Sequence, residues 1–314
     1  MLLRRLKLLA ILALVLVLAL GGSYLVAPQW LLRADQARQA MAAHVEKHTV
    51  QAGDTTWSYY EGGEGPTLLL LHGFAADKTV WLPVARELSA HFHLVIPDLP
   101  GWGESSRVAG ASYDIDAQAA RLQSFVEALR LQRAVLIGHS MGGAIAGVYA
   151  AAHPAQVAEL ALVDTFGLQA KDSPLDRELR AGKDPFVFDD RAGFARLLAA
   201  AFVQPPTVPG RIADVFVTRN RVDRSFIERT LGELRQPSQS LALQSRLDQL
   251  SMPVLGLWCQ ADRVVDVSAL DSLRSGLSRA PTISASVLHG CNHLPMLEKP
   301  EDTARILTGF ALSH

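Results

Sequence analysis

Hydrophobic residues along this chain form one long uncharged run near the N-terminus and several short runs farther on. Residues 8–32 contain no charged side chain, and those from Leu8 to Leu20 are all apolar. A helix rises about 1.5 Å per residue, so the run would reach about 37 Å, enough to cross a hydrocarbon core of about 30 Å. The pattern therefore predicts a transmembrane anchor helix over residues 8–32.

The charges on either side of this run predict its orientation. Arg4, Arg5 and Lys7 precede it, whereas the basic residues after it are sparser. Basic residues favour the cytoplasmic side of a membrane, so we expect residues 1–7 in the cytoplasm and the chain after residue 32 outside it. In a bacterium, that side is the periplasmic side of the inner membrane. Residues 33–48 are rich in alanine, glutamine and charge, and they predict a juxtamembrane helix.

A cleaved signal peptide is the alternative interpretation of the N-terminal run. A basic start followed by an apolar stretch is typical of signal peptides, and Gly21, Gly22 and Ser23 offer small residues for cleavage. We favour a retained anchor, because the uncharged run continues well beyond the length of a signal core. The two glycines would then allow two anchor helices to pack closely, so a homodimer through the anchor is one expected partner interaction.

The rest of the chain alternates between short apolar runs and amphipathic stretches. Short apolar runs suit strands that are buried on both faces. The runs are residues 67–71, 94–97, 134–137, 160–163, 253–258 and 282–288. Residues 117–131 and 303–312 carry apolar side chains at helical spacing. This alternation predicts an α/β fold with a mostly parallel central sheet and helices on both of its faces.

One stretch, residues 168–250, interrupts the alternation with several helical patterns and no convincing buried strand. One apolar face at helical spacing consists of Phe194, Leu197, Leu198, Ala201 and Phe202. We expect this stretch to form a helical cap, or lid, on a core formed by residues 49–167 and 251–314. The apolar face either packs the cap onto the core or, in part, lines a channel for an apolar chain of a ligand.

The composition excludes nucleic acid as a partner and leaves open whether the two cysteines are bonded to each other. Thirty basic and 31 acidic residues give a net charge of -1, so no basic field is available to bind nucleic acid. Cys259 and Cys291 lack the spacing of metal ligands, and no metal or organic cofactor is implied. We favour two small buried hydrophobic residues for this pair, with a disulfide as the alternative in an oxidising compartment.

The strongest chemical motif is a serine between glycines. The sequence Gly138-His139-Ser140-Met141-Gly142 follows a short apolar run and precedes a helical stretch. Glycines two positions on either side of a serine suit a sharp strand-to-helix turn that exposes the hydroxyl group. The helix N-terminus would also present N–H groups to a developing negative charge. Ser140 is therefore the candidate nucleophile.

With this motif, the chain from residue 50 onward resembles the α/β-hydrolase fold family. Leu71-His72-Gly73-Phe74 is similar to the family's oxyanion loop, 98–105 to its next strand-end loop, and 290–295 to the loop that holds the catalytic histidine. An anchor followed by such a hydrolase resembles the membrane-anchored monoacylglycerol lipases and the bacterial membrane-bound phospholipases A. The resemblance implies that the backbone N–H groups of Phe74 and Met141 form the oxyanion hole.

A serine nucleophile needs a base to take its proton and an acid to orient that base. His293 is the expected base, because it follows the last predicted strand and fits the order Ser, Asp, His. Asp262 lies where the family carries its triad carboxylate, although Cys259 stands where the family commonly has glycine. The alternatives for the acid are Asp164, at the end of an earlier strand, and Asp266, which we expect to cap a helix instead.

These features predict a membrane-anchored serine hydrolase of lipid-like acyl esters, with a lipid substrate and the bilayer as partners. Rival interpretations are a hydrolase of carbon–carbon bonds, a cofactor-free haloperoxidase and, least favoured, a non-catalytic anchored binding protein. Serine at position 140 excludes the enzymes of this fold that need an aspartate nucleophile. Contacts with the substrate are expected from His139, Trp81, Phe194, Leu198 and Phe202.

Overall fold

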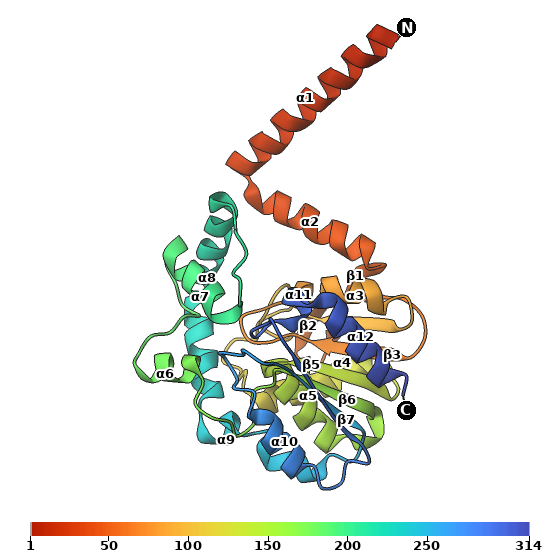
Figure 1. Ribbon diagram of the computed structural model, residues 1–314, viewed down its shortest axis with the longest axis vertical. Coiled ribbons are helices and arrows are strands. Elements are labelled where there is room, and N and C mark those ends of the chain that lie inside the picture. The colour runs from red at the N-terminus through yellow and green to blue at the C-terminus, as the bar shows by residue number, and fades with distance from the viewer. Residues whose placement is uncertain (1, 314) are drawn as a thin grey trace.

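A β-sheet forms the centre of the computed structural model, which describes residues 2–313 (Figure 1). Within that range the sheet has eight strands in the order β1-β2-β4-β3-β5-β6-β7-β8. β2 pairs antiparallel with β1 and with β4, whereas the other neighbours are parallel. The strands are β1 (Val45–Ala52), β2 (Thr55–Gly62), β3 (Thr67–Leu71), β4 (His93–Pro97), β5 (Ala134–His139), β6 (Val157–Val163), β7 (Val254–Cys259) and β8 (Ile283–Leu288). Met1, part of the segment predicted to be cytoplasmic, and His314 lie outside the described residues.

The apolar runs of the sequence become the parallel part of this sheet. Every residue of β5 and of β7 is buried. Strands covered on both faces do not meet water, which is why they consist of nearly continuous apolar residues. The predicted α/β fold with a mostly parallel sheet flanked by helices is confirmed.

The antiparallel strands β1 and β2 are an addition that the hydrophobic pattern does not predict. β1 lies at the edge of the sheet, and only its end residues, Val45 and Ala52, are buried. An edge strand with an exposed face carries polar and charged side chains, so its sequence lacks an apolar run. The helix predicted over residues 33–48 is therefore wrong at its end, because the helix stops at Ala42 and residues 45–48 belong to β1.

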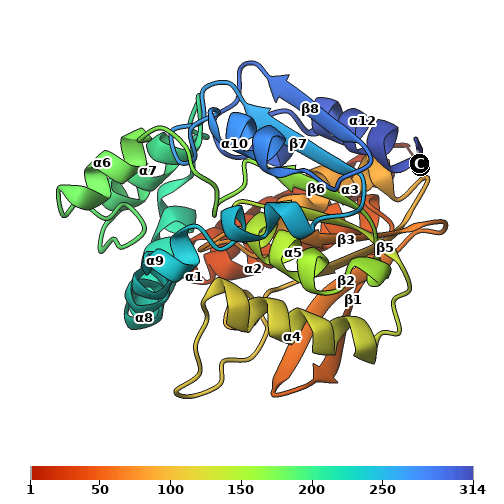
Figure 2. The same cartoon turned by 90° about the horizontal axis from the view of Figure 1, so that it is seen from below.

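Helices cover both faces of the sheet (Figure 2). The helices α4 (Ile115–Ala128), α5 (Met141–Ala152) and α10 (Ala269–Gly276) pack on one face, and α3 (Leu82–Leu88) and α12 (Pro300–Ala311) pack on the other. Short turns in the loops are η1 (Lys78–Trp81), η2 (Pro154–Gln156) and α11 (Pro295–Glu298). α5 is buried along almost its whole length, which holds its N-terminus in a fixed place at the end of β5.

Two helices precede the sheet. α1 (Leu2–Val26) extends away from the folded body, and α2 (Pro28–Ala42) connects it to β1 (Figure 1). The part of α1 from Arg4 to Val26 is long enough and apolar enough to cross a membrane. The uncharged run predicted as one span over residues 8–32 is divided at Ala27. This residue precedes a proline, which disfavours helical backbone there.

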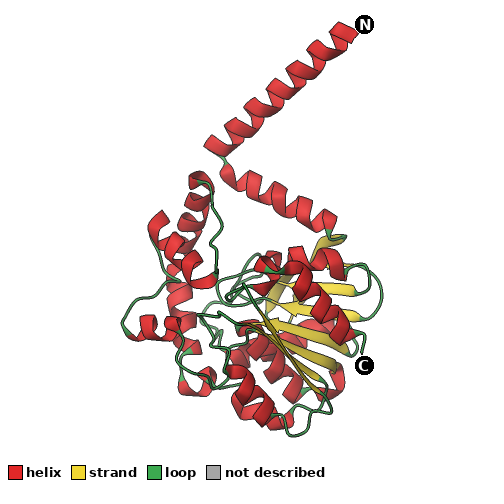
Figure 3. Cartoon of the chain, viewed as in Figure 1, coloured by secondary structure: helices red, strands yellow, loops and turns green. Residues whose placement is uncertain are grey.

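The segment between β6 and β7, residues 168–250, is helical and contains no strand. We call this segment the cap. Its helices are α6 (Pro174–Arg180), α7 (Arg191–Ala201), α8 (Gly210–Leu234), α9 (Pro237–Ser240) and η3 (Gln244–Gln249). They lie beside the sheet (Figure 3), and α8 contacts α2. α7 and α8 bury a small cluster of their own that includes Phe188, Phe194 and Val217, so the cap has a separate interior.

Candidate active site

A strained turn at Ser140 joins β5 to α5. Ser140 has φ 51° and ψ −118°, a conformation that residues other than glycine rarely adopt. A Cβ atom on Gly138 would lie 2.4 Å from the carbonyl oxygen of Gly142, and one on Gly142 would lie 2.4 Å from that of His72. No side chain fits at either position, which explains the glycines that flank the serine. This is the geometry of a strand-to-helix turn that presents a nucleophile.

The loop after β3 passes against this turn. A Cβ atom on Gly73 would lie 3.1 Å from Cβ of Ser140 and 2.8 Å from Nδ1 of His139. Phe74 follows directly, and Met141 is the first residue of α5, so its N–H has no carbonyl partner within the helix. The two residues predicted to form the oxyanion hole therefore both adjoin the Ser140 turn.

His293 and Asp262 are hydrogen bonded to each other in the interior. Nδ1 of His293 lies 3.0 Å from Oδ2 of Asp262. Asp262 follows β7 and His293 follows β8, and because these strands are parallel neighbours, both loops leave the same edge of the sheet. Oδ1 of Asp262 accepts the N–H groups of Val264, at 2.7 Å, and Val265, at 3.0 Å. The backbone thus fixes the orientation of the carboxylate toward the imidazole.

Burial governs the charge of this pair. The side chain of His293 is 8% exposed and that of Asp262 is 0% exposed. Burial lowers the pKa of His293 to about 3, although the nearby Glu298 carboxylate acts in the opposite direction. Burial raises the pKa of Asp262, and two backbone N–H groups oppose that shift. A neutral imidazole that donates its Nδ1–H to Asp262 keeps Nε2 available to accept a proton.

The two alternative carboxyl groups have other partners. Asp164, at the end of β6, is fully buried, and its Oδ1 accepts the N–H of Cys259 at 2.8 Å. Burial raises the pKa of Asp164 well above its usual value, and the neighbouring Asp262 carboxyl group adds to this shift, so the charged form of Asp164 is disfavoured. Asp266 accepts a backbone N–H at the start of α10. Of the three candidates, Asp262 is the one bonded to the imidazole.

His139 is hydrogen bonded to the loop that carries His293. It was expected to contact the substrate, but it is only 2% exposed. Its Nε2 lies 2.7 Å from the carbonyl oxygen of His293, and the two rings are 4.7 Å apart. Burial lowers the pKa of His139 well below its usual value, so the ring is neutral and donates its Nε2–H to that carbonyl. The side chain therefore holds the backbone of the His293 loop.

The other residues expected to contact the substrate pack mainly in the interior. Trp81 is fully buried in the apolar cluster on the α3 face of the sheet. Phe194 is buried in the cap, stacked on Phe216 at 5.0 Å, and Leu198 packs against the same cluster. Phe202, half-buried, ends α7. Helical spacing identifies an apolar face correctly, but it does not reveal that the partner of this face is α8.

A row of aromatic rings leads from the oxyanion loop to the cap, and the sequence analysis did not single it out. The ring of Phe74 makes edge contacts with Trp102 and with Phe186 of the cap, each at 5.0 Å. Trp102 in turn contacts Phe226 of α8 at 4.9 Å. Isolated aromatic residues in loops have no periodic signal, so only the fold brings them together. They form an apolar wall beside Phe74.

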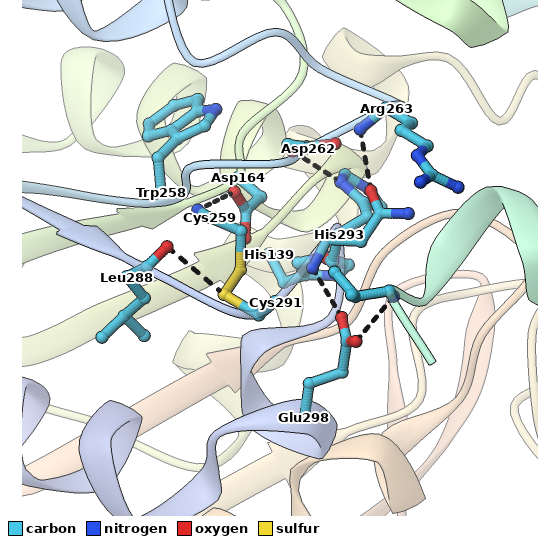
Figure 4. The surroundings of a disulfide bond; sticks show 12 residues. His139, Asp164, Trp258, Cys259, Asp262, Arg263, Leu288, Cys291, His293 and Glu298 are labelled. Carbon is cyan, nitrogen blue, oxygen red and sulfur yellow. Dashed lines mark hydrogen bonds and ion pairs between the residues drawn. A yellow bond between two sulfur atoms is a disulfide. The ribbon is translucent and has the colours of Figure 1, made fainter. Parts of the chain in front are cut away.

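The two cysteines form a disulfide bond. Cys259, the last residue of β7, is bonded to Cys291, and their Cα atoms are 5.4 Å apart (Figure 4). The expectation of two unlinked hydrophobic residues is therefore wrong. Cys259 pairs in register with Leu288 of β8, and Cys291 follows three residues later, so the sheet itself brings the two side chains together. The bond joins the loop of Asp262 to the loop of His293.

No group of three or more His, Cys, Asp or Glu side chains within residues 2–313 is arranged to hold a metal ion. The structure does contain a cavity of about 1160 Å³ between α2, η1 and α8. Leu32 and Arg33 of α2, Lys78, and Phe216 and Arg219 of α8 contribute to its lining. The cavity therefore lies where the cap meets the helix that follows the anchor.

A buried ion pair holds the loop that carries Phe74. Nζ of Lys78 lies 2.5 Å from Oδ2 of Asp98 and 2.9 Å from Oε2 of Glu104. The side chains of Lys78 and Asp98 are 3% and 0% exposed, respectively. Oδ1 of Asp98 also accepts the backbone N–H of Lys78 at 2.7 Å. These bonds connect the loop that carries Phe74 to the loop after β4.

Breaking this pair should destabilise the fold strongly. In Lys78→Met, Asp98 remains buried without its cation, and removal of one partner of a buried pair costs about 3–5 kcal/mol. We expect the midpoint of thermal unfolding to fall by about 10 °C. Adding Asp98→Asn should recover part of the loss. Lys47→Met, which removes the exposed partner of Glu104, is the matched control and should cost less than about 1 kcal/mol.

This chain is similar to lipases and to a phospholipase. The profile of the alpha/beta hydrolase fold family matches residues 66–300. Monoacylglycerol lipase ABHD6 of Mus musculus is 32% identical over 261 residues, which cover 80% of this chain and 77% of that protein. A membrane phospholipase A, described as a bacterial virulence factor, matches with a TM-score of 0.85 and 38% identity over 96% of this chain and 97% of that one. A putative lipase from Acinetobacter baumannii AYE matches with a TM-score of 0.77 and 28% identity, over 89% of this chain and 95% of that one.

Proposed function

This chain belongs to the alpha/beta hydrolase fold family, and we propose that it is a membrane-anchored serine hydrolase that cleaves acyl esters of lipids. The observation that carries the proposal is the strained turn at Ser140 beside His139, whose ring lies 4.7 Å from that of His293 in a buried, hydrogen-bonded His293–Asp262 pair. The similarity to a monoacylglycerol lipase and to a membrane phospholipase A supports a carboxylic ester of a lipid as the substrate.

Each residue has a separate task in the proposed reaction. His293 takes the hydroxyl proton of Ser140, whose Oγ attacks the ester carbonyl carbon to give a tetrahedral intermediate. The N–H groups of Phe74 and Met141 stabilise the negative oxygen. The intermediate then expels the alcohol, which receives the proton from His293. An acyl group remains on Ser140. Water, deprotonated by the same imidazole, then releases the fatty acid, and Asp262 orients the imidazole throughout.

The N-terminal helix supports a substrate drawn from a bilayer. We propose that α1 remains as an anchor, with its basic start in the cytoplasm and the catalytic part on the other side. The cavity between α2 and α8 then lies on the membrane side of the cap, and its lining combines apolar and charged side chains. A lipid would pass between cap and core toward the aromatic wall at Phe74 without crossing much water.

Gly21 and Gly22, which have open space around them, would allow the anchor helices of two copies of this chain to pair.

Two measurements on the full-length protein in detergent test this function. A fluorophosphonate probe should label the protein, because such probes react with an activated serine. Esters of graded chain length, monoacylglycerols and phospholipids should then reveal hydrolysis of at least one long-chain lipid ester. Labelling without hydrolysis of any ester would favour a carbon–carbon bond hydrolase, and absence of labelling would contradict a serine enzyme altogether.

A further inference from the structure

The C-terminal end of α7, in the cap, is hydrogen bonded to the two loops that carry Asp262 and His293. The carbonyl oxygen of Ala201 accepts the backbone N–H of His293 at 3.1 Å. The carbonyl oxygen of Ala200 accepts the side-chain Nδ2–H of Asn292 at 2.7 Å. The last carbonyl groups of a helix have no partner within the helix, so they need partners elsewhere. Here the catalytic loops supply them.

Asn292 connects the cap to the Asp262 loop as well as to the His293 loop. It is fully buried, and it directly precedes His293. While its Nδ2 donates to α7, its Oδ1 accepts the backbone N–H of Arg263, the residue after Asp262, at 2.7 Å. One amide side chain therefore fixes the distance between three segments: the end of α7, the Asp262 loop and the His293 loop.

Glu298 makes a second connection of the same kind. Its Oε1 accepts the backbone N–H of Asn292 at 2.7 Å, and its Oε2 accepts the backbone N–H of Val203, just beyond α7, at 2.8 Å (Figure 4). Each carboxylate oxygen thus holds a different segment, one in the catalytic core and one in the cap. Asn292 and Glu298 together form what we call the clasp.

We propose that the clasp, Asn292 and Glu298, sets the geometry of the His293–Asp262 pair according to the position of the cap. This inference rests on the proposed hydrolase function. If α7 moves away, the buried Asn292 amide and the half-buried Glu298 carboxylate lose the partners that α7 and Val203 provide, and a buried polar group without a partner is costly. The loops must then shift to find other partners, and they carry the base and the acid with them. Asn292 and Glu298 are therefore positioning residues.

The first test separates positioning from substrate binding. Asn292→Asp keeps an oxygen to accept the Arg263 N–H but loses the N–H that donates to Ala200. In the full-length protein, we expect kcat on a short soluble ester to fall about 10-fold, with KM within about twofold, because Asn292 adjoins the reacting pair and is hydrogen bonded to no residue that was expected to contact the substrate. Fluorophosphonate labelling should slow by a similar factor. Glu301→Gln, on the exposed side of α12, is the matched control and should change neither rate.

The second test asks whether Asn292 and Glu298 affect the reaction through their hydrogen bonds to the cap. Ala200→Gly loosens the end of α7 without changing a residue of either catalytic loop, so it should lower kcat in the wild-type background. In the Asn292→Asp background, the same change should have a smaller effect, because the bond to the Ala200 carbonyl is already lost and only the connections through Ala201 and Glu298 remain. Full additivity of the two changes would overturn the coupling.

Two other outcomes are informative. If kcat per folded molecule is unchanged in Asn292→Asp, as judged by the thermal unfolding midpoint and by labelling rate, the clasp has only a structural role and the inference is wrong. If the wild-type protein itself neither reacts with the probe nor cleaves esters, the proposed function fails instead. The two failures are therefore distinguishable.

Discussion

Ser140→Ala should lower ester hydrolysis by about 10⁴- to 10⁶-fold, the largest effect expected of any single substitution in this chain. Without the hydroxyl group there is no acyl-enzyme, and only the oxyanion N–H groups and binding remain. His293→Ala should cause a loss of the same order, because the hydroxyl then keeps its proton. Both losses are measured as kcat on a short soluble ester, and neither variant should react with a fluorophosphonate probe.

The carboxyl groups near His293 provide a matched pair for this experiment. Asp262→Asn should lower kcat by about 10⁴-fold, because the amide no longer holds the imidazole in the tautomer that accepts a proton. Asp164→Asn should have a much smaller effect, because the imidazole is hydrogen bonded to Asp262 and not to Asp164, and an amide oxygen at position 164 can still accept the Cys259 N–H. Unchanged unfolding midpoints would show that the fold persists. Loss of activity in Asp164→Asn, with Asp262→Asn still active, would contradict the assignment of the acid.

The residues of the candidate site were predictable where the signal is local. The turn at Ser140 depends on glycines within two positions of the serine, and the close approaches at Gly138 and Gly142 occur within the motif or with the neighbouring loop. The buried strands were predictable because burial on both faces requires continuous apolar residues. In both cases the pattern can be recognised within a short stretch of sequence, although the close approach at Gly142 involves His72 of another loop.

The features that were missed depend on distant parts of the chain. The apolar spacing of α7 indicates a buried face, but whether Phe194 meets a substrate or Phe216 depends on where α8 lies. His139 donates to a carbonyl group 154 positions away. The disulfide requires that β7 and β8 be neighbours, which no property of Cys259 or Cys291 reveals. Such contacts follow from the topology of the sheet rather than from residue type.

The anchor should matter for lipids in membranes and not for soluble substrates. Removal of residues 1–27 should leave hydrolysis of a short ester within about twofold but lower hydrolysis of lipids in vesicles by about 10²-fold, because the tethered enzyme works at a high local concentration of substrate. The deletion ends at Ala27, the residue between α1 and α2. It keeps α2, which lines the cavity and contributes Ala40 to the buried core.

Two further variants separate tethering from folding. An unrelated apolar helix in place of α1 should restore hydrolysis in vesicles, because any helix long enough to cross the bilayer tethers the enzyme equally well. Removal of residues 1–42 should instead impair both substrates, because α2 packs on α3 and α8 and its loss exposes part of the core. If removal of residues 1–27 reduces both activities equally, then α1 supports folding or assembly, and delivery of lipid from the bilayer is not its role.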